Sequence, residues 1–314
     1  MNFAFIGFAG YIAPRHLDAI KELGGNVVAA FDVIEPSQSH QENLPSTKFF
    51  NDYSLFIEFL KTHKNSSKID FVSVCSPNYF HFQQIKDSLN AGINVICEKP
   101  IVGSVHELKL LGEIERLSGQ KVYSILQLRY HEAIKNLNKI VASQPNQHFS
   151  VNLTYIAGRD KKYLESWKGD IEKSFGIEAN IGIHFFDMLT HVFGELQRSY
   201  LHYYESNKSS GYLKFKQADV KWFLSIDVDD LPKNTNLDSN TYRSITINNT
   251  ELDFSSLSGF KDLHLTSYEE ILANKGFGLE DVTPSIEILD RINNKDIDDF
   301  NTDQAHPFLL NMIQ

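Results

Sequence analysis

The segment Asn94-Val-Ile-Cys-Glu-Lys-Pro-Ile-Val102 runs from an apolar, β-branched stretch directly into Glu98, Lys99 and Pro100. A short, continuously apolar stretch of this kind is typical of a buried strand in a parallel sheet. Lys99 would then follow the carboxyl end of a strand, where open α/β sheets bind their ligands. Pro100 has no N–H to donate and restricts Lys99 to an extended backbone. We expect Lys99 to contact a substrate and a cofactor together, although the same three residues also fit an ordinary surface loop.

The regions around this segment alternate between strand and helix patterns. Short apolar runs predict strands at 2–7, 26–31, 48–50, 71–75, 94–97 and 121–126. Helical patterns fall between them, at 14–23, 53–63, 79–91 and 104–118. A βαβ alternation with continuously apolar strands predicts an α/β fold built on a doubly wound parallel sheet.

The second half of the chain follows a different pattern. Apolar and polar residues alternate at 149–155 and 220–226, and further strand candidates lie at 199–204, 211–215 and 242–247. Strands with two unlike faces are usually antiparallel. With helices at 132–143, at 181–193 and after Leu265, we predict an α+β domain whose mostly antiparallel sheet is covered on one side by helices. The other side would carry several aromatic residues, either as a subunit interface or as a packed core face.

The length and the change of pattern predict two domains, at 1–126 and 127–314. A net charge of -10 argues against nucleic acid as a partner. No secretory leader is recognisable, and no apolar stretch approaches the roughly 20 residues that span a bilayer, so we expect a cytoplasmic protein that does not contact membranes. Cys75 and Cys97 lie in apolar runs and are expected to be buried thiols, and no metal site is predicted.

A glycine-containing loop, Gly7-Phe8-Ala9-Gly10-Tyr11-Ile12-Ala13, follows the first predicted strand and opens the first predicted helix. Glycines permit the tight turn and let the backbone approach a pyrophosphate, while the helix N-terminus supplies N–H groups. The loop departs from G-x-G-x-x-G by one added residue and by Ala13 at the last glycine position. Asp32 ends the second strand, where a carboxylate accepts hydrogen bonds from ribose hydroxyls and disfavours a 2′-phosphate. The pattern predicts a Rossmann domain that binds NAD rather than NADP.

Two further runs make the chain similar to a known family. Together with the loop, Asp32 and Glu98-Lys99-Pro100, the runs Ser76-Pro77-Asn78-Tyr79-Phe80-His81 and Asn180-Ile-Gly182-Ile-His184-Phe-Phe-Asp187 resemble motifs of the Gfo/Idh/MocA family, named after glucose–fructose oxidoreductase and inositol dehydrogenase. The resemblance covers nearly the whole chain and implies a Rossmann domain followed by a substrate-binding and oligomerisation domain. The cofactor contacts that it implies are Gly7, Ala9, Gly10, Tyr11, Ile12, Asp32, Ser76, Pro77, Asn78, His81, Glu98, Lys99 and Gln127.

Longer runs resemble one branch of that family, the UDP-N-acetylglucosaminuronate 3-dehydrogenases of bacterial surface-polysaccharide (O-antigen) synthesis. The resemblance implies oxidation of the sugar C3 hydroxyl to a ketone by NAD, an aminotransferase as the next enzyme, and a homotetramer. It leaves open whether NADH leaves after each turnover or is reoxidised in place by a 2-oxo acid such as 2-oxoglutarate. The runs that carry it are 9–16, 126–129, 167–170, 173–176, 180–182 and 306–308.

Four residues form the predicted catalytic group. His184, with an ordinary pKa near 6.5, suits a general base for the hydroxyl proton. Lys99 would orient the hydroxyl and stabilise the developing alkoxide, although the two roles can be exchanged. Asp187 lies one helical turn after His184 and would orient its ring. Asn180 stands where the wider family has an acid, and because an amide cannot take a proton, a proton relay ending there is not supported.

An anionic nucleotide sugar requires local cations despite the acidic total. The segment 159–173 combines arginine and lysines with aromatic residues, which suit phosphate groups and stacking on uracil or sugar. It also contains acidic residues, so a solvated charged loop explains it almost as well. The predicted substrate contacts are Lys99, Arg129, Arg159, Tyr163, Trp167, Lys168, Asn180 and His184.

Two other functions fit the same fold. One is an NAD-dependent dehydrogenase of a free sugar, inositol or diol, which would show no affinity for UDP. The other is a ligand sensor without catalysis, and Lys99 together with His184 argues against it because a sensor has no chemical need for both.

Overall fold

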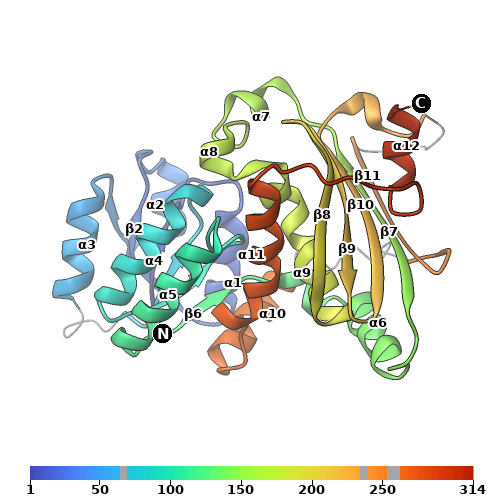
Figure 1. Cartoon of the computed structure of the whole chain (residues 1–314). Helices are drawn as coiled ribbons and strands as arrows, with labels where there is room; N and C mark the ends of the chain where they lie inside the picture. The colour runs from blue at the N-terminus through green and yellow to red at the C-terminus, as the bar shows by residue number, and fades with distance from the viewer. Residues whose placement is uncertain (64–68, 234–239, 253–261, 314) are drawn as a thin grey trace. The chain divides into compact units, whose positions relative to one another are not determined.

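The computed structural model describes residues 1–63, 69–233, 240–252 and 262–313 (Figure 1). The chain divides into two compact units, Met1–Gln127 with Gly259–Thr283, and Leu128–Ser258 with Pro284–Gln314. The division predicted from the sequence assigned the whole C-terminal segment to the second domain.

The first unit contains a parallel sheet with the strand order β3-β2-β1-β4-β5-β6. This is the order of a doubly wound Rossmann sheet, with its reversal between β1 and β4. The predicted parallel sheet is therefore confirmed. Its strands are β1 (Asn2–Ile6), β2 (Asn26–Phe31), β3 (Lys48–Phe50), β4 (Phe71–Val74), β5 (Asn94–Cys97) and β6 (Val122–Ser124).

Capping residues set the ends of several helices in this unit. The Asp52 side chain accepts from the N–H of Leu55 at the start of α3, and the Ser104 side chain accepts from Glu107 at the start of α5. Gly119, in the left-handed conformation, ends α5. The helices are α1 (Ala13–Glu22), α2 (Gln38–Asn43), α3 (Tyr53–Thr62), α4 (His81–Asn90), α5 (Val105–Ser118) and α10 (Asp262–Leu272).

Helix α10 belongs to the first unit although it follows most of the second unit in sequence. It packs along α1, and its Tyr268 is fully buried in the same core as Phe3 and Phe71. The sequence predicted a helix in this region but gave no sign of where it docks, because an apolar face does not specify its partner.

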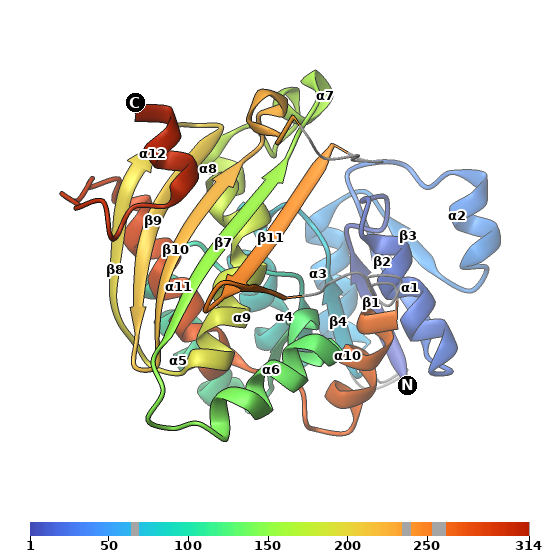
Figure 2. The same cartoon turned by 90° about the vertical axis from the view of Figure 1, so that its right-hand side faces the viewer.

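The second unit contains a mixed sheet with the strand order β12-β11-β7-β10-β9-β8 (Figure 2). β7 and β10 pair in parallel and the other neighbours are antiparallel, so the predicted mostly antiparallel sheet is confirmed. The strands are β7 (Phe149–Ala157), β8 (Leu196–Tyr204), β9 (Lys208–Phe215), β10 (Ala218–Ser225), β11 (Thr241–Ile247) and β12 (Thr250–Glu251). The helices are α6 (Glu132–Ala142), α7 (Lys161–Glu165), α8 (Ile171–Ser174), α9 (Ile183–Phe193), α11 (Leu279–Asn293), in which the boundary at Pro284 falls, and α12 (Pro307–Ile313).

Alternation along the strands gives this sheet two different faces. On one face Trp222 packs edge-on against Phe186 of α9, with ring centroids 5.3 Å apart. On the other face Phe223 is fully buried against the rings of His306 and Phe308, at 5.8 and 5.3 Å. The face that carries Phe223 is therefore packed at this residue, under the segment that leads into α12, and a subunit interface on the sheet remains a prediction. No helix in the described residues is long and apolar enough to cross a membrane.

Candidate cofactor and catalytic site

The loop after β1 has the geometry that a phosphate group requires. Gly7 has a φ of +85°, and a Cβ on it would lie 2.8 Å from both the carbonyl carbon and oxygen of Cys75, so only glycine fits. Helix α1 then begins at Ala13, its N-cap residue Ile12 provides no side-chain hydrogen bond, and Pro14 occupies its first turn. The first N–H groups of a helix attract anions when no side chain satisfies them. The residues present therefore fit a pyrophosphate, as the sequence predicted.

Asp32 is held at the end of β2 by the backbone around it. One carboxylate oxygen accepts from the N–H of Ala9 at 3.0 Å, and the other accepts from Ile34 at 3.1 Å. Each oxygen keeps a lone pair for a further donor, such as a ribose hydroxyl. Val33 and Ile34, which follow Asp32, are 76% and 58% exposed and offer apolar surface beside it. This arrangement fits the adenosine half of a dinucleotide.

His81 connects the Ser76–His81 segment to the segment that follows Lys99. Its Nδ1 lies 2.8 Å from the carbonyl oxygen of Pro100, and its Nε2 lies 2.9 Å from that of Ser76. Burial lowers the pKa of His81, whereas the hydrogen bonds to the two carbonyls act to raise it. Its predicted contact with the cofactor remains a prediction, as do those of Pro77 and the buried Asn78. Gln127, another predicted cofactor contact, has a buried Oε1 with no partner in the described part of the chain, which would suit an incoming amide donor.

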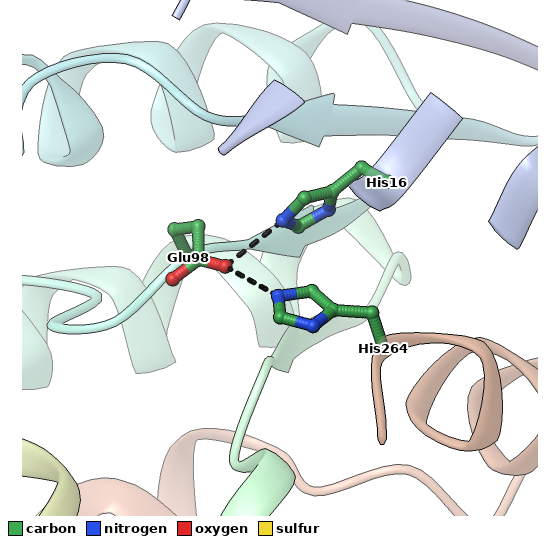
Figure 3. A group of neighbouring side chains, drawn as sticks. All are labelled: His16, Glu98 and His264. Carbon is green, nitrogen blue, oxygen red and sulfur yellow. Dashed lines mark hydrogen bonds and ion pairs between the residues drawn. The ribbon is translucent and has the colours of Figure 1, made fainter. Parts of the chain in front are cut away.

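Glu98 directs its carboxylate into the first unit. Oε1 accepts from Nε2 of His16 at 2.9 Å and from Nε2 of His264 at 3.4 Å (Figure 3). The peptide bond between Lys99 and Pro100 is cis, and Lys99 itself is half-buried. Burial alone would raise the pKa of Glu98, but the two histidine hydrogen bonds and the positive charge of Lys99 hold that pKa well below its usual range. Glu98 is therefore a buried anion, and its predicted cofactor contact remains a prediction.

In the second unit, Asn180 lies in a π-helical turn, η3 (Glu178–Gly182), that leads directly into α9. Its Nδ2 donates to the carbonyl oxygen of Gly176 at 3.1 Å and to that of Lys168 at 3.4 Å. The sequence predicted a regular helix from residue 181 and gave no sign of the wider turn. Turns of this kind are frequent at functional sites. His184 follows it, half-buried in the first turn of α9.

Arg129 and Asp187 form a buried ion pair with each other. Arg129 Nε donates to Oδ2 at 3.0 Å, and Nη2 donates to Oδ1 at 2.7 Å. The turn η2 spans Gln127–Tyr130. The ion pair fixes the residues Leu128–Tyr130 of this turn to α9. The sequence assigned Arg129 to the substrate and Asp187 to the ring of His184. The structure gives each a strong partner in the other, and those two roles remain predictions.

The predicted cationic segment forms a cluster of rings and cations. The Arg159 guanidinium lies 5.1 Å from the Tyr163 ring centroid, and Lys168 Nζ lies 5.8 Å from that of Trp167. Burial, and then the nearby charge of Arg159, lower the pKa of Lys168. Ion pairs neutralise Lys161 with Glu165 and Lys173 with Asp170. Arg159, Tyr163, Trp167 and Lys168 are therefore brought together as the sequence predicted, whereas their contact with a substrate remains a prediction.

Lys99 belongs to the first unit and His184 to the second, so their convergence on one hydroxyl remains a prediction. Sequence reasoning missed His264 and Tyr268 and treated His16 only as part of a run. Each is a buried polar residue on a helix, and no motif marks it. The Rossmann sheet and the loop Gly7–Ala13 after β1, which forms a cradle for phosphate, identify the first unit as a dinucleotide-binding domain.

Comparison with known proteins agrees with that class. Models of an oxidoreductase family match residues 1–125 as its NAD-binding Rossmann fold and residues 147–227 as its C-terminal alpha/beta domain. The chain belongs to this family, the Gfo/Idh/MocA oxidoreductases, and its cofactor is NAD.

Two solved structures are similar over almost the whole chain. The WlbA (WbpB) dehydrogenase from Thermus thermophilus, in complex with NAD and alpha-ketoglutarate, is 38% identical with a TM-score of 0.93, and the match covers 98% of this chain and 99% of that one. In complex with NAD and UDP-GlcNAcA, it matches at 37% identity with a TM-score of 0.92 and the same coverage. Among curated relatives, glucose-6-phosphate 3-dehydrogenase of Bacillus subtilis is 25% identical over 194 residues, 59% of this chain and 52% of that protein. The chain thus spans about half the length of that curated relative.

Proposed function

We propose that the protein oxidises the C3 hydroxyl of UDP-N-acetylglucosaminuronate to the 3-keto sugar, with NAD as acceptor. The observation that carries this proposal is the likeness, 38% identical over 98% of the chain, to a dehydrogenase that was also solved with NAD and UDP-GlcNAcA. The cluster of Arg159, Tyr163, Trp167 and Lys168 supports it, because cations beside aromatic rings suit a uridine diphosphate.

The residues of this chain divide the chemical work. NAD, when bound, supplies the hydride acceptor. The loop at Gly7 and the N-terminus of α1 would hold its pyrophosphate, and Asp32 would hold the adenosine ribose. A ring nitrogen of His184 takes the proton of the C3 hydroxyl as the hydride leaves C3, and the ammonium of Lys99 stabilises the negative charge that develops on the oxygen.

The wider setting of the reaction is also proposed. The relative solved with alpha-ketoglutarate supports reoxidation of NADH in place by a 2-oxo acid. The product ketone would be the substrate of an aminotransferase in O-antigen synthesis. We further propose a cytoplasmic homotetramer, which light scattering of the purified protein and cell fractionation would test.

The direct experiment mixes purified protein with UDP-N-acetylglucosaminuronate and follows reduced nicotinamide by absorbance. The arms are with and without added NAD, and with and without 2-oxoglutarate. A 3-keto product, identified by mass and NMR, would establish the reaction, and conversion that requires 2-oxoglutarate but no added NAD would establish recycling. The absence of product in every arm would reject the proposal.

A second candidate is a 3-dehydrogenase of a simpler sugar phosphate. The match to glucose-6-phosphate 3-dehydrogenase favours it, at 25% identity over 59% of the chain. Arms with glucose 6-phosphate and with free glucose decide between the two. Turnover of either, without measurable binding of UDP, would favour this second candidate, whereas bound NAD with no hydride transfer to any sugar would indicate a sensor.

A further inference from the structure

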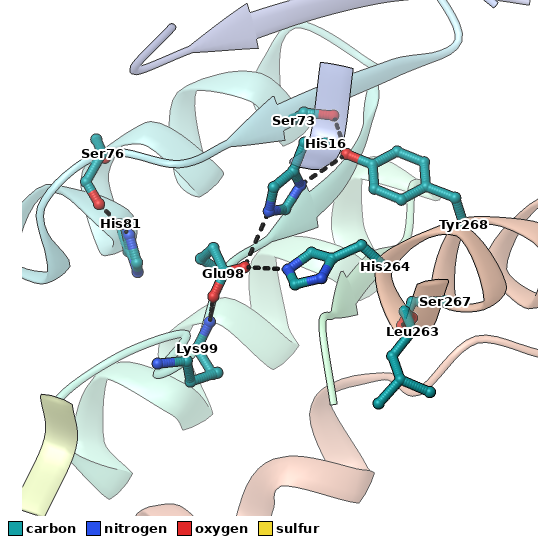
Figure 4. A network of polar contacts seen from close by, with 10 residues as sticks. All are labelled: His16, Ser73, Ser76, His81, Glu98, Lys99, Leu263, His264, Ser267 and Tyr268. Carbon is teal, nitrogen blue, oxygen red and sulfur yellow. Dashed lines mark hydrogen bonds and ion pairs between the residues drawn. The ribbon is translucent and has the colours of Figure 1, made fainter. Parts of the chain in front are cut away.

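A chain of buried hydrogen bonds connects four elements of the first unit and ends at Lys99 (Figure 4). Ser73 Oγ on β4 lies 2.8 Å from the Tyr268 hydroxyl on α10, which lies 3.0 Å from Nδ1 of His16 on α1. His16 Nε2 then contacts Glu98 Oε1 at 2.9 Å. On its other side, Glu98 Oε2 accepts the backbone N–H of Lys99 at 3.2 Å. Glu98 is therefore the junction between a fixed network and the lysine assigned to the chemistry.

The direction of each hydrogen bond follows from the charge on Glu98. An ionised carboxylate only accepts, so Nε2 of His16 and Nε2 of His264 both carry a proton. Nδ1 of neutral His16 is then an acceptor, so the Tyr268 hydroxyl donates to it and in turn accepts from Ser73. Burial lowers the pKa of His16, which agrees with a neutral ring. The result is one negative charge held by the N–H donors of two histidines.

These three side chains do not fit a bound metal ion. His16, Glu98 and His264 offer ligand atoms within 4.8 Å of one another. Tetrahedral zinc ligands at about 2.1 Å from the ion lie about 3.4 Å apart. The 2.9 Å between His16 and Glu98 is shorter and is an ordinary hydrogen-bond length.

Burial shifts the pKa of several other ionisable groups near Glu98 toward their neutral forms. Burial raises the pKa of the thiols of Cys75 and Cys97 and of the Tyr268 hydroxyl well above their usual values, and it lowers the pKa of His81 on α4. The charges of a protonated His16 and of Lys99 both act on Glu98, and Arg15 acts on His16; because burial lowers the pKa of His16 and favours its neutral ring, Lys99 is the cation that stays beside Glu98. The buried negative charge therefore has the Lys99 ammonium as its counter-charge.

We propose that Glu98 is a positioning residue, which holds the Lys99 backbone and keeps its side chain protonated, and that His16 and His264 keep Glu98 charged for this role. This inference rests on the proposed function, in which the Lys99 ammonium stabilises the developing alkoxide. It assigns to Glu98 an action through Lys99, separate from any contact with the cofactor.

The test measures the protonation of Lys99 without any substrate. Lysines of the purified protein are reductively methylated with ¹³C, and the Lys99 resonance is assigned by its loss in K99R. We expect its titration midpoint to fall by at least one pH unit in E98Q and to stay unchanged in E113Q, which neutralises an exposed acid on α5. An E98Q midpoint equal to that of the wild type would overturn the proposal.

A second variant decides the question if E98Q does not fold. H264A removes the weaker donor at 3.4 Å and keeps the His16 branch. At acid pH the chemical shift of the Lys99 resonance also reports the protonation of Glu98. The midpoint of this second transition should rise by at least one pH unit in H264A. An unmoved midpoint would contradict the role of the histidines.

Kinetics separate this inference from the proposed function. With UDP-N-acetylglucosaminuronate, E98Q should lose at least tenfold in kcat, with the KM for NAD within threefold and the alkaline limb of kcat moved to lower pH. A large rise in the KM for NAD with an unmoved limb would make Glu98 a cofactor contact instead. If no sugar turns over, the proposed function fails, while the resonance of Lys99 still decides the role of Glu98.

Discussion

Replacing Asp187 with asparagine should destabilise the second unit far more than an ordinary surface change. The side chains of Arg129 and Asp187 are only 5% and 3% exposed, and two charge-assisted hydrogen bonds of 2.7 and 3.0 Å join them. Such bonds contribute about 1.5–3 kcal/mol each, or about 3–6 kcal/mol for the two. Removing one partner of a buried ion pair costs about 3–5 kcal/mol because the other charge stays buried and unpaired. We therefore expect D187N to lower the free energy of unfolding by about 3–5 kcal/mol.

Urea denaturation, monitored by tryptophan fluorescence, measures the free energy of unfolding of the second unit. Both tryptophans, Trp167 and Trp222, lie in Leu128–Ser258, so their signal reports on the second unit. The matched control is the exposed pair of Glu132 and Lys135, joined at 2.9 Å with side chains 74% and 43% exposed. Loss of an exposed pair costs about 0–1 kcal/mol. E132Q should therefore stay close to the wild type.

The double variant R129Q/D187N provides the stricter test. With both charges removed no unpaired ion remains buried, so the double variant should be more stable than the sum of the two single losses predicts. The reasoning is refuted if D187N lies within about 1 kcal/mol of the wild type, or if the two single losses simply add.

Three further changes test other parts of the molecule. G7A places a Cβ 2.8 Å from the Cys75 carbonyl and should weaken NAD binding at least tenfold, as measured by calorimetry. An unchanged affinity for NAD would contradict the assignment of this loop to the pyrophosphate. H184N should lower kcat by about 10²–10⁴-fold with little change in substrate binding, and normal turnover would reject His184 as the base. Burial lowers the pKa of His306 from 6.5 to about 3 in the folded protein. Between these two pH values the unfolded chain binds more protons than the folded protein, so the free energy of unfolding falls as the pH drops below about 6.5. By pH 5 the free energy of unfolding is lower by about 2 kcal/mol, and H306Q should remove this part of the pH dependence measured by urea unfolding.

The sequence predicted those parts of the fold that depend on local patterns. The apolar run at 94–97 is β5 with the predicted bounds, and Ser104, the predicted first residue of a helix, is the N-cap of α5. Helix α2 was missed because its residues Gln38–Asn43 are polar and none is buried, so no apolar periodicity marks it. The docking of α10 was missed because it depends on packing between segments far apart in the sequence.

The candidate site shows the same division between local and distant information. The cradle at Gly7 and its acid at Asp32 were predictable because strand, turn and helix follow one another in the chain. The partner of Arg129 was not, since Asp187 lies 58 residues away and both residues sit in motifs that suggested separate roles. His16 and Glu98 are 82 residues apart, and two buried polar side chains show no pairing until the chain is folded.

Asn180 shows why a departure from a family motif has to be interpreted in three dimensions. In the sequence, an amide in place of an acid removes a possible proton acceptor. In the structure, its NH₂ group donates to the carbonyl oxygens of Gly176 and Lys168, which a carboxylate cannot do. The amide therefore fixes the π-helical turn that leads into α9 and joins it to the segment that carries Trp167 and Lys168. Under the proposed mechanism, the proton taken by His184 has to leave by a route other than residue 180, and position 180 serves the backbone that holds His184 in place.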